Sequence, residues 1–204
     1  MHPYCFLCSR SVAESIGPIP CASCQTQLQL PKGGLQGDTP LPWRALGHYK
    51  GPLRSLLLEL RQTPDNQRLQ SLIAFLKQTL TFQSTDLLVP IPSWKKKRGN
   101  PLPAHLAERL GVASANLLER RFAGTSQHRL NRCRRLSNPE GSFRLLSQPS
   151  AERTLWLMDD ILTTGATALT VQKAMQETGV RGKGLICLPA RRCNGIENTD
   201  FHRR

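Results

Sequence analysis

The sequence has no long apolar stretch. None of its hydrophobic runs approaches the ~20 consecutive apolar residues with which a helix crosses a bilayer. Cys5 and Cys8 stand where a secretory signal would need an unbroken apolar segment. We therefore expect a soluble, cytoplasmic protein without a membrane span. In the reducing cytosol, cysteines serve more often as metal ligands or free thiols than in disulfides, so their spacing must decide their role.

Acidic residues are scarce. The chain has 14 Asp and Glu against 28 Lys and Arg, which gives a net charge of +14. This balance favours nucleic acids, phosphorylated ligands or anionic surfaces as partners. The charge is also localised, because residues 91–144 contain twelve Lys and Arg but only three Glu. We expect a positive surface over this stretch, which would serve a partner in addition to solubility.

The sequence also has no recognisable nucleophilic site. No combination of Ser, His and Asp, or of Cys and His, has the pattern of a catalytic triad or dyad. None of the five histidines has metal-ligand spacing with another. A length of 204 residues allows one domain of ordinary size and a small appendage.

Four cysteines near the N-terminus form two Cys-x-x-Cys pairs. Twelve residues separate the pairs, and the four residues are Cys5, Cys8, Cys21 and Cys24. A two-residue gap lets both thiolates of a pair face one metal ion, and two pairs complete a tetrahedral site. The spacing predicts a small zinc ribbon with structural Zn²⁺, while four free thiols or a redox pair are the alternative.

The composition divides the chain into three parts. Proline and glycine become frequent after Cys24, without helical or strand periodicity, so we predict a linker over residues 31–45. The zinc-ribbon module would then occupy residues 1–30 and the main domain residues 46–204. In the main domain, apolar runs at 87–89, 155–158 and 185–188 predict buried strands. Helical patterns at 53–60, 69–80, 102–110 and 167–178 separate them, and this alternation is typical of a parallel α/β sheet.

One segment contains most of the chemical information. The apolar run 155–158 leads into Asp159 and Asp160, and a loop of threonines and small residues then opens a predicted helix. Small residues let backbone N–H groups approach a phosphate, and the N-terminus of a helix attracts anions. Carboxylates at this edge of a sheet can accept hydrogen bonds from sugar hydroxyls. The segment therefore predicts a ribose phosphate site, although an acidic helix cap beside a tight turn uses the same residue types.

The segment from Asp159 to Thr167 resembles the phosphoribosyl pyrophosphate (PRPP) motif of type I phosphoribosyltransferases, in which two acidic residues follow an apolar strand and precede Thr-Thr-Gly-x-Thr. Nearly the whole chain resembles the competence protein ComF family. The patterns behind this second resemblance are the four-cysteine module, residues 49–53, Val89-Pro90-Ile91-Pro92 with its basic loop, and Gln127-x-x-Leu130 followed by Arg135-x-x-Asn138 and Phe143.

These resemblances imply a type I phosphoribosyltransferase-like parallel sheet flanked by helices. They imply that Asp159 and Asp160 are catalytic residues that hold the ribose hydroxyls. The residues implied to bind the 5′-phosphate are Thr163, Thr164, Gly165, Ala166 and Thr167. The residues implied to form the pyrophosphate loop and a neighbouring basic loop are Pro90, Ile91, Lys96, Arg98, Gly99 and Asn100. In an enzyme, Mg²⁺ would accompany PRPP and help to neutralise the leaving pyrophosphate.

Three functions remain open at this point. The chain could be a phosphoribosyltransferase with an unidentified acceptor. It could instead be a non-catalytic protein that senses PRPP or a nucleotide-like ligand and handles single-stranded DNA, since the ComF resemblance implies DNA uptake during natural transformation. The zinc module could also dock a helicase or processing protein of DNA uptake. The basic run from Lys95 to Arg98 would suit DNA, and a solvated surface turn is its simpler explanation.

Overall fold

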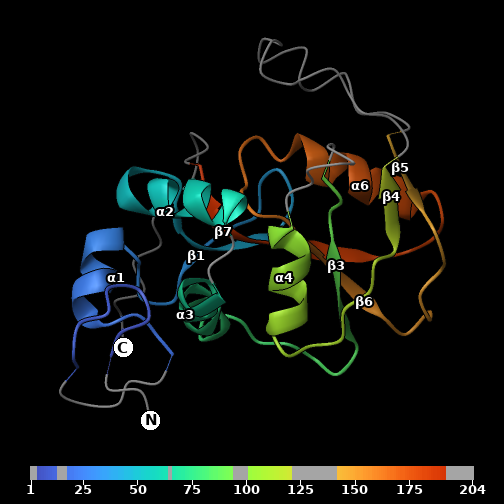
Figure 1. Cartoon of the computed structure of the whole chain (residues 1–204). Coiled ribbons are helices and arrows are strands. Elements are labelled where there is room, and N and C mark those ends of the chain that lie inside the picture. The colour runs from blue at the N-terminus through green and yellow to red at the C-terminus, as the bar shows by residue number, and fades with distance from the viewer. Residues whose placement is uncertain (1–3, 13–17, 64–65, 94–100, 121–141, 192–204) are drawn as a thin grey trace, which may run out of the picture.

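A five-stranded, mainly parallel sheet forms the centre of the protein (Figure 1). The computed structural model describes residues 4–12, 18–63, 66–93, 101–120 and 142–191. The strand order is β1-β2-β7-β6-β3, and only β1 runs antiparallel to its neighbour. The strands are β1 (Leu35–Gly37), β2 (Trp43–His48), β3 (Asp86–Pro90), β6 (Thr154–Met158) and β7 (Gly182–Ala190). The predicted α/β fold is confirmed.

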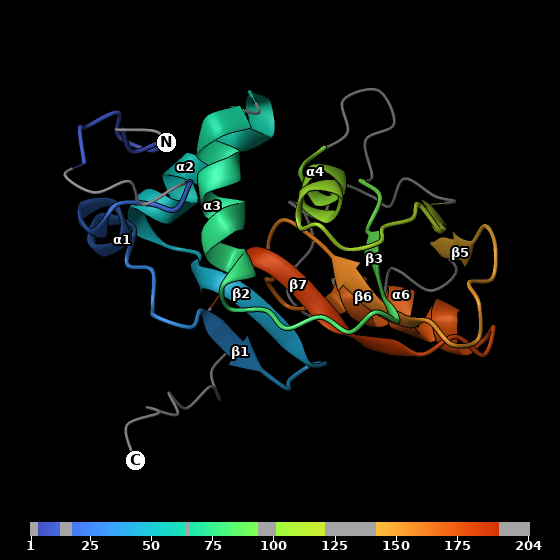
Figure 2. The ribbon, with the colours of Figure 1, turned by 90° about the horizontal axis from the view of Figure 1, so that it is seen from below.

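Helices cover both faces of this sheet (Figures 1 and 2). One face packs against α1 (Ala22–Leu28), α2 (Gly51–Gln62), α3 (Asn66–Lys77) and α4 (Leu102–Arg109). The other face packs against α6 (Ala166–Gln176) and a small antiparallel sheet of β4 (Leu118–Arg120) and β5 (Phe143–Leu145). The result is a three-layer arrangement with a hydrophobic core on each side of the sheet.

The side chains of the strands alternate between the two cores. Trp156 and Met158 of β6 belong to the core under α2, α3 and α4, whereas Leu155 and Leu157 belong to the core under α6. Successive side chains of a strand point to opposite faces, so a strand buried on both faces is apolar throughout. This is why short continuous apolar runs identified β3, β6 and β7.

The segment 31–45 differs from its expected character. It contains β1 and the beginning of β2, where composition indicated a linker without strand periodicity. Strand β2 pairs with β1 on one side and with β7, about 140 residues later, on the other, and local composition could not reveal the pairing with β7. Helix α1 was likewise absent from the prediction. No helix in the described ranges is long and apolar enough to cross a membrane.

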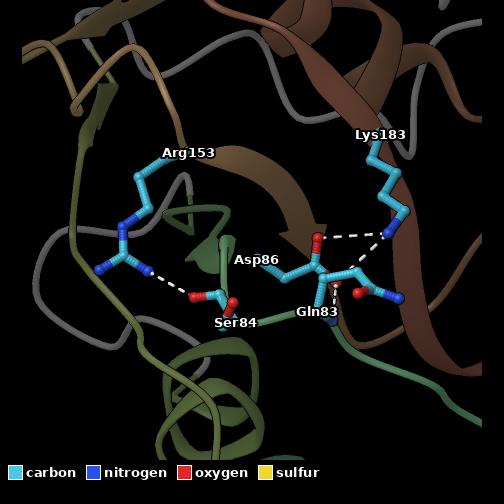
Figure 3. A network of polar contacts seen from close by, with 5 residues as sticks. All are labelled: Gln83, Ser84, Asp86, Arg153 and Lys183. Carbon is cyan, nitrogen blue, oxygen red and sulfur yellow. Dashed lines mark hydrogen bonds and ion pairs between the residues drawn. The ribbon is translucent and has the colours of Figure 1, made fainter.

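A polar network secures the amino edge of the sheet (Figure 3). Asp86, at the start of β3, is completely buried. Its carboxylate accepts hydrogen bonds from the backbone N–H of Gln83 at 2.9 Å and from Lys183 Nζ at 3.2 and 3.3 Å. Nearby, Arg153 donates to the carbonyl oxygen of Ser84 at 3.1 Å. The network joins the loop before β3 to the first residues of β6 and β7.

Candidate functional site

The predicted site lies at the opposite, carboxyl edge of the sheet. The parallel strands β2, β3, β6 and β7 all end there. Backbone hydrogen bonds continue past the strand ends: the N–H of Asp159 donates to Ile186 at 3.0 Å, and that of Ile91 donates to Met158 at 2.8 Å. The N–H of Tyr49 donates to Ala190 at 2.8 Å. Segments far apart in the sequence therefore converge beside Asp159, at the edge where open α/β sheets bind ligands.

The second aspartate of the pair is buried and ion-paired. The Asp160 side chain is 5% exposed, and its Oδ2 accepts a hydrogen bond from Arg61 Nε at 2.5 Å. Arg61 is in the last turn of α2 and 33% exposed. Burial alone would lower the pKa of Arg61, but its hydrogen bond and its charge interaction with Asp160 raise the pKa above its ordinary value. A fixed positive charge thus lies against this carboxylate.

The first aspartate lies in a different environment. Asp159 Oδ1 accepts a hydrogen bond from the backbone N–H of Asp160 at 2.8 Å, and the residue is partly exposed. Burial of the carboxyl group and then the charge of Asp160 raise the pKa of Asp159 well above its usual range, while Arg61 opposes this rise. Two adjacent carboxylates at one strand end therefore resist ionising together.

A second arginine lies near the pair. Arg120, the last residue of β4, stacks its guanidinium over the ring of Phe143 at 4.9 Å. Burial lowers the pKa of Arg120, and the charge of Asp159 counteracts that effect. Among the residues that the structure describes, Arg120 Nε is buried without a hydrogen-bond partner. The acidic pair is therefore flanked by cations from two separate elements.

The loop after the aspartates makes a tight turn into α6. Gly165 caps the helix with φ +75°, in the left-handed region that glycine adopts without strain. A Cβ at this position would lie 2.3 Å from Pro40 Cγ, so the turn also depends on the absence of a side chain. Thr164 Oγ1 accepts from the Ala166 N–H at 3.4 Å, and Thr163 is exposed while Thr167 is partly exposed. The predicted phosphate-binding residues therefore form one compact turn at the positive end of a helix.

The predicted pyrophosphate loop is described only in part. Pro90 ends β3 beside Met158 of β6, and the Ile91 side chain is buried. The side chains of Pro90 and Ile91 are therefore turned into the core, away from a ligand. Lys96, Arg98, Gly99 and Asn100 lie outside the described residues. Most of the basic stretch 91–144 does so too; of its described members, Arg109 donates to Asn66 at 2.8 Å and Arg144 pairs with Glu119 at 2.8 Å.

The four N-terminal cysteines come together. Their Sγ atoms all lie within 4.8 Å of one another, with 3.9 Å between Cys5 and Cys24 and 3.8 Å between Cys8 and Cys21. Tetrahedral zinc with Zn–S bonds of about 2.3 Å requires sulfur atoms ~3.8 Å apart, so the cluster can hold a metal ion such as zinc. Cys21 caps α1 and Cys24 lies in its first turn.

The thiols of this cluster differ in acidity. Burial opposes ionisation of Cys5, but backbone hydrogen bonds from Cys21, Leu7 and Cys8 lower the pKa of Cys5 to about 6. Burial, followed by hydrogen bonds with the neighbouring thiols, raises the pKa of Cys24. A metal ion would favour the thiolate form of all four residues.

Sequence patterns did not indicate Arg61 or Arg120 beside the site. Arg61 borders the apolar stripe of α2, four residues after Leu57, where an exposed arginine is ordinary. Ninety-nine residues separate it from Asp160 in the sequence. Arg120 was noticed only as part of the basic stretch. Neither pairing leaves a signal in local spacing, because the sheet topology creates both.

Comparison with known proteins adds an independent line of evidence. No family model matches the chain. The chain is 26% identical over 203 residues to the DNA utilization protein YhgH of Salmonella typhimurium (strain LT2), which covers 90% of this chain and 88% of that protein. Identity to the proteins of the same name from Salmonella typhi and Escherichia coli (strain K12) is 27% and 26%, with the same coverage. The chain is a distant homologue of these YhgH proteins. The alignments cover most of both chains.

Proposed function

We propose that this protein binds PRPP or a related phosphoribosyl ligand in the loop from Asp159 to Thr167, on a ComF-like, type I phosphoribosyltransferase-like fold. The observation that carries the proposal is the junction of an acidic pair with a glycine turn that opens α6 at the carboxyl edge of a parallel sheet. A ribose phosphate has a diol and a phosphate a few ångströms apart. The junction offers a carboxylate and a helix N-terminus at such neighbouring positions.

The chemistry follows from these groups. The 5′-phosphate accepts hydrogen bonds from the backbone N–H groups and hydroxyls of Thr163 to Thr167, and the ribose hydroxyls donate to the carboxylates of Asp159 and Asp160. In a transferase, the bond from ribose C1 to pyrophosphate breaks as an acceptor attacks C1. Mg²⁺ brought with PRPP, together with cations of the basic loop around Lys96 and Arg98, would neutralise the departing pyrophosphate.

We further propose that residues 1–30 are a module held by structural Zn²⁺ on Cys5, Cys8, Cys21 and Cys24. The distances between the thiols support this proposal. Residues 46–204 would form the ligand-binding domain, and residues 31–45 would connect the two while contributing β1 and the start of β2. A zinc module of this size can also serve as a docking surface for a protein partner such as a helicase.

The biological process that we propose is DNA uptake or utilization. The distant homology to proteins called DNA utilization proteins supports it, as does the net charge of +14, which favours a polyanionic partner.

Isothermal titration calorimetry of Mg²⁺-PRPP into the zinc-loaded protein tests the ligand. Binding to the wild type that disappears in the Asp159→Asn/Asp160→Asn double variant is the expected result. Absence of binding to the folded wild type would contradict the phosphoribosyl site and leave DNA handling as the function to pursue.

The concentrated basic charge of residues 91–144 supports a second candidate, a non-catalytic protein that holds single-stranded DNA. Its affinity for an oligonucleotide should then fall steeply as salt rises, because phosphate contacts release counterions. Charge reversal at Lys95 to Arg98 should weaken the binding and flatten its salt dependence. An unchanged salt slope in that variant would contradict a DNA contact by this loop.

A further inference from the structure

We propose that Arg61 is a positioning residue of the candidate site, whose guanidinium neutralises Asp160 and so eases the ionisation of Asp159 beside it. The electrostatic part of this inference concerns the protein alone. Its consequence for ligand binding rests on the proposed function.

The geometry of the pair is specific. Arg61 Nε points at Asp160 Oδ2 at 2.5 Å, and the carboxylate is 5% exposed. An arginine that served only solubility would not lie against a buried acid. Asp160 also joins the backbone of the site: its N–H donates to Asp159 Oδ1 at 2.8 Å, and its carbonyl accepts from the Leu188 N–H at 3.2 Å. A displacement of Asp160 would therefore reach Asp159 directly.

Helix α2 holds Arg61 in place. The buried Leu57 and Leu60, one on the preceding turn and one adjacent to Arg61, anchor the helix to the sheet. The helix begins directly after β2, whose end is tied to β7 by the hydrogen bond from Tyr49 to Ala190. Both ends of the Arg61–Asp160 pair thus rest on strands that pair with β7. The side chain reaches the acidic pair from a rigid support, which is the requirement for a positioning residue.

Arg61 contacts the pair directly, and the other titratable groups that face the pair come from separate elements. The loop after β6 contributes Asp159 and Asp160, and Tyr49 follows the end of β2. Strand β4 contributes Arg120, and β7 contributes the buried thiol of Cys187. Neither a tyrosine nor a cysteine side chain carries a positive charge, so Tyr49 and Cys187 cannot balance a carboxylate. Arg120 interacts with Asp159 through its charge, without a hydrogen bond at its buried Nε among the described residues.

Loss of Arg61 would deprive two adjacent carboxylates, one of them buried, of the charge of its guanidinium. Two carboxyl groups on adjacent residues of one strand end tend to share a proton, because their negative charges repel each other. A protonated carboxyl group accepts fewer hydrogen bonds than a carboxylate, so the site would hold a ribose diol less well at low pH. The effect should fade as pH rises and the shared proton is lost.

Carbon-13 NMR titration of the aspartate carboxyl groups, without ligand, tests the electrostatic part in the full chain. The variants are Arg61→Gln, Arg61→Lys and the control Arg68→Gln, which removes an arginine that pairs with Glu59 on the same helix as Arg61. We expect the apparent pKa of the pair to rise by about one unit or more in Arg61→Gln. It should stay close to the wild-type value in the other two. An unchanged titration in a folded Arg61→Gln protein would overturn the proposal.

A second variant covers the case in which Arg61→Gln does not fold. The double variant Arg61→Gln/Asp160→Asn removes both charges of the buried pair and leaves neither one unpartnered. Asp159 should then titrate as a single group, without the second step that two coupled carboxylates give. A two-step titration that persists in the double variant would contradict the coupling of Asp159 to Asp160.

Calorimetry with Mg²⁺-PRPP at pH 6 and pH 8 tests the consequence for binding. Affinity of Arg61→Gln should fall about tenfold at pH 6, relative to wild type, and less at pH 8. A purely structural role would lower affinity equally at both pH values and would overturn the positioning role. If the wild type binds no PRPP, the proposed function fails, and the NMR titration still decides the role of Arg61.

Discussion

The two edges of the sheet each contain a buried aspartate paired with a basic side chain, yet they are built differently. At the amino edge, Asp86 is the one carboxylate of its network, and Lys183 and a backbone N–H satisfy it. At the carboxyl edge, Asp160 has Arg61, but Asp159 lies next to it, and Arg120 is close by. At the amino edge, one lysine and one backbone N–H therefore balance the charge of Asp86 and satisfy its hydrogen bonds, as is usual for a structural network.

The difference favours the carboxyl edge as the place where a ligand binds. Adjacent carboxylates repel each other and one of them resists ionisation, which costs stability. A fold that needed only to close its sheet would gain from a single acid at each edge, as at Asp86. The extra charge of the carboxyl edge is explained if a ligand completes the site. Functional sites commonly tolerate such locally unfavourable arrangements.

The largest effect should come from the two glycines that flank α6. Gly165 at the carboxyl edge and Gly179 at the amino edge both have φ +75°, but only at Gly165 would an added Cβ meet another atom, Pro40 Cγ at 2.3 Å. Gly179→Ala should lower the free energy of unfolding by about 1 kcal/mol, from backbone conformation alone. Gly165→Ala should lower it by about 2–4 kcal/mol, because overpacking is added. Urea denaturation measures both, and equal losses would contradict the role of the Pro40 contact.

Substitution of the ion-paired aspartates at the two edges, Asp86 and Asp160, should distinguish an effect on stability from an effect on ligand binding. Asp86→Asn and Asp160→Asn should each lower the free energy of unfolding by about 1–3 kcal/mol, since each leaves a basic side chain without its carboxylate. Only Asp160→Asn should also weaken binding of Mg²⁺-PRPP in calorimetry. A comparable loss of affinity in Asp86→Asn would mean that the amino edge is coupled to the site.

Stability should depend on pH through Asp159. Its pKa is raised in the folded protein, so its proton contributes stability that is fully present below the unfolded pKa of about 4 and is lost as pH rises through the folded pKa. Between pH 4 and pH 5, just above the unfolded pKa, we expect the free energy of unfolding of the wild type to fall by roughly 1 kcal/mol relative to that of Asp159→Asn. Urea denaturation at stepped pH gives this difference. Parallel curves for the two proteins would show that Asp159 titrates normally.

Removal of the zinc ion that we propose for the cysteine cluster should have the smallest effect on the two edges of the sheet. Chelation, or Cys21→Ser, should raise amide hydrogen exchange in residues 4–12 and 18–30, because their four thiols would lose the ion that joins them. Exchange in β6 and β7 should change little, since both strands are central in the sheet. Cys187→Ser, outside the cluster, serves as the control for metal content. Metal analysis should find one zinc ion per chain in Cys187→Ser and none in Cys21→Ser.

Much of the fold could be predicted because its signals are local. Continuous apolar runs identified β3, β6 and β7, and leucine spacing identified α2 and α3. Strand β2 escaped, since its pairing with β7 depends on residues distant in the sequence. The same limit applies to the site. The motif from Asp159 to Thr167 is contiguous and could be recognised, whereas Arg61 approaches Asp160 only because the sheet and α2 bring them together.

The order of the strands has a consequence for how the chain is made. Strand β7 lies in the middle of the sheet, with β1 and β2 on one side and β6 and β3 on the other, yet it is the last described strand to be synthesised. During synthesis on the ribosome, the β1–β2 half and the β6–β3 half of the sheet cannot pair with β7 until residues 182–190 emerge. Each half then exposes an unpaired apolar edge, which favours aggregation of nascent chains. Truncation before β7 should therefore give two unjoined halves in place of a smaller native protein.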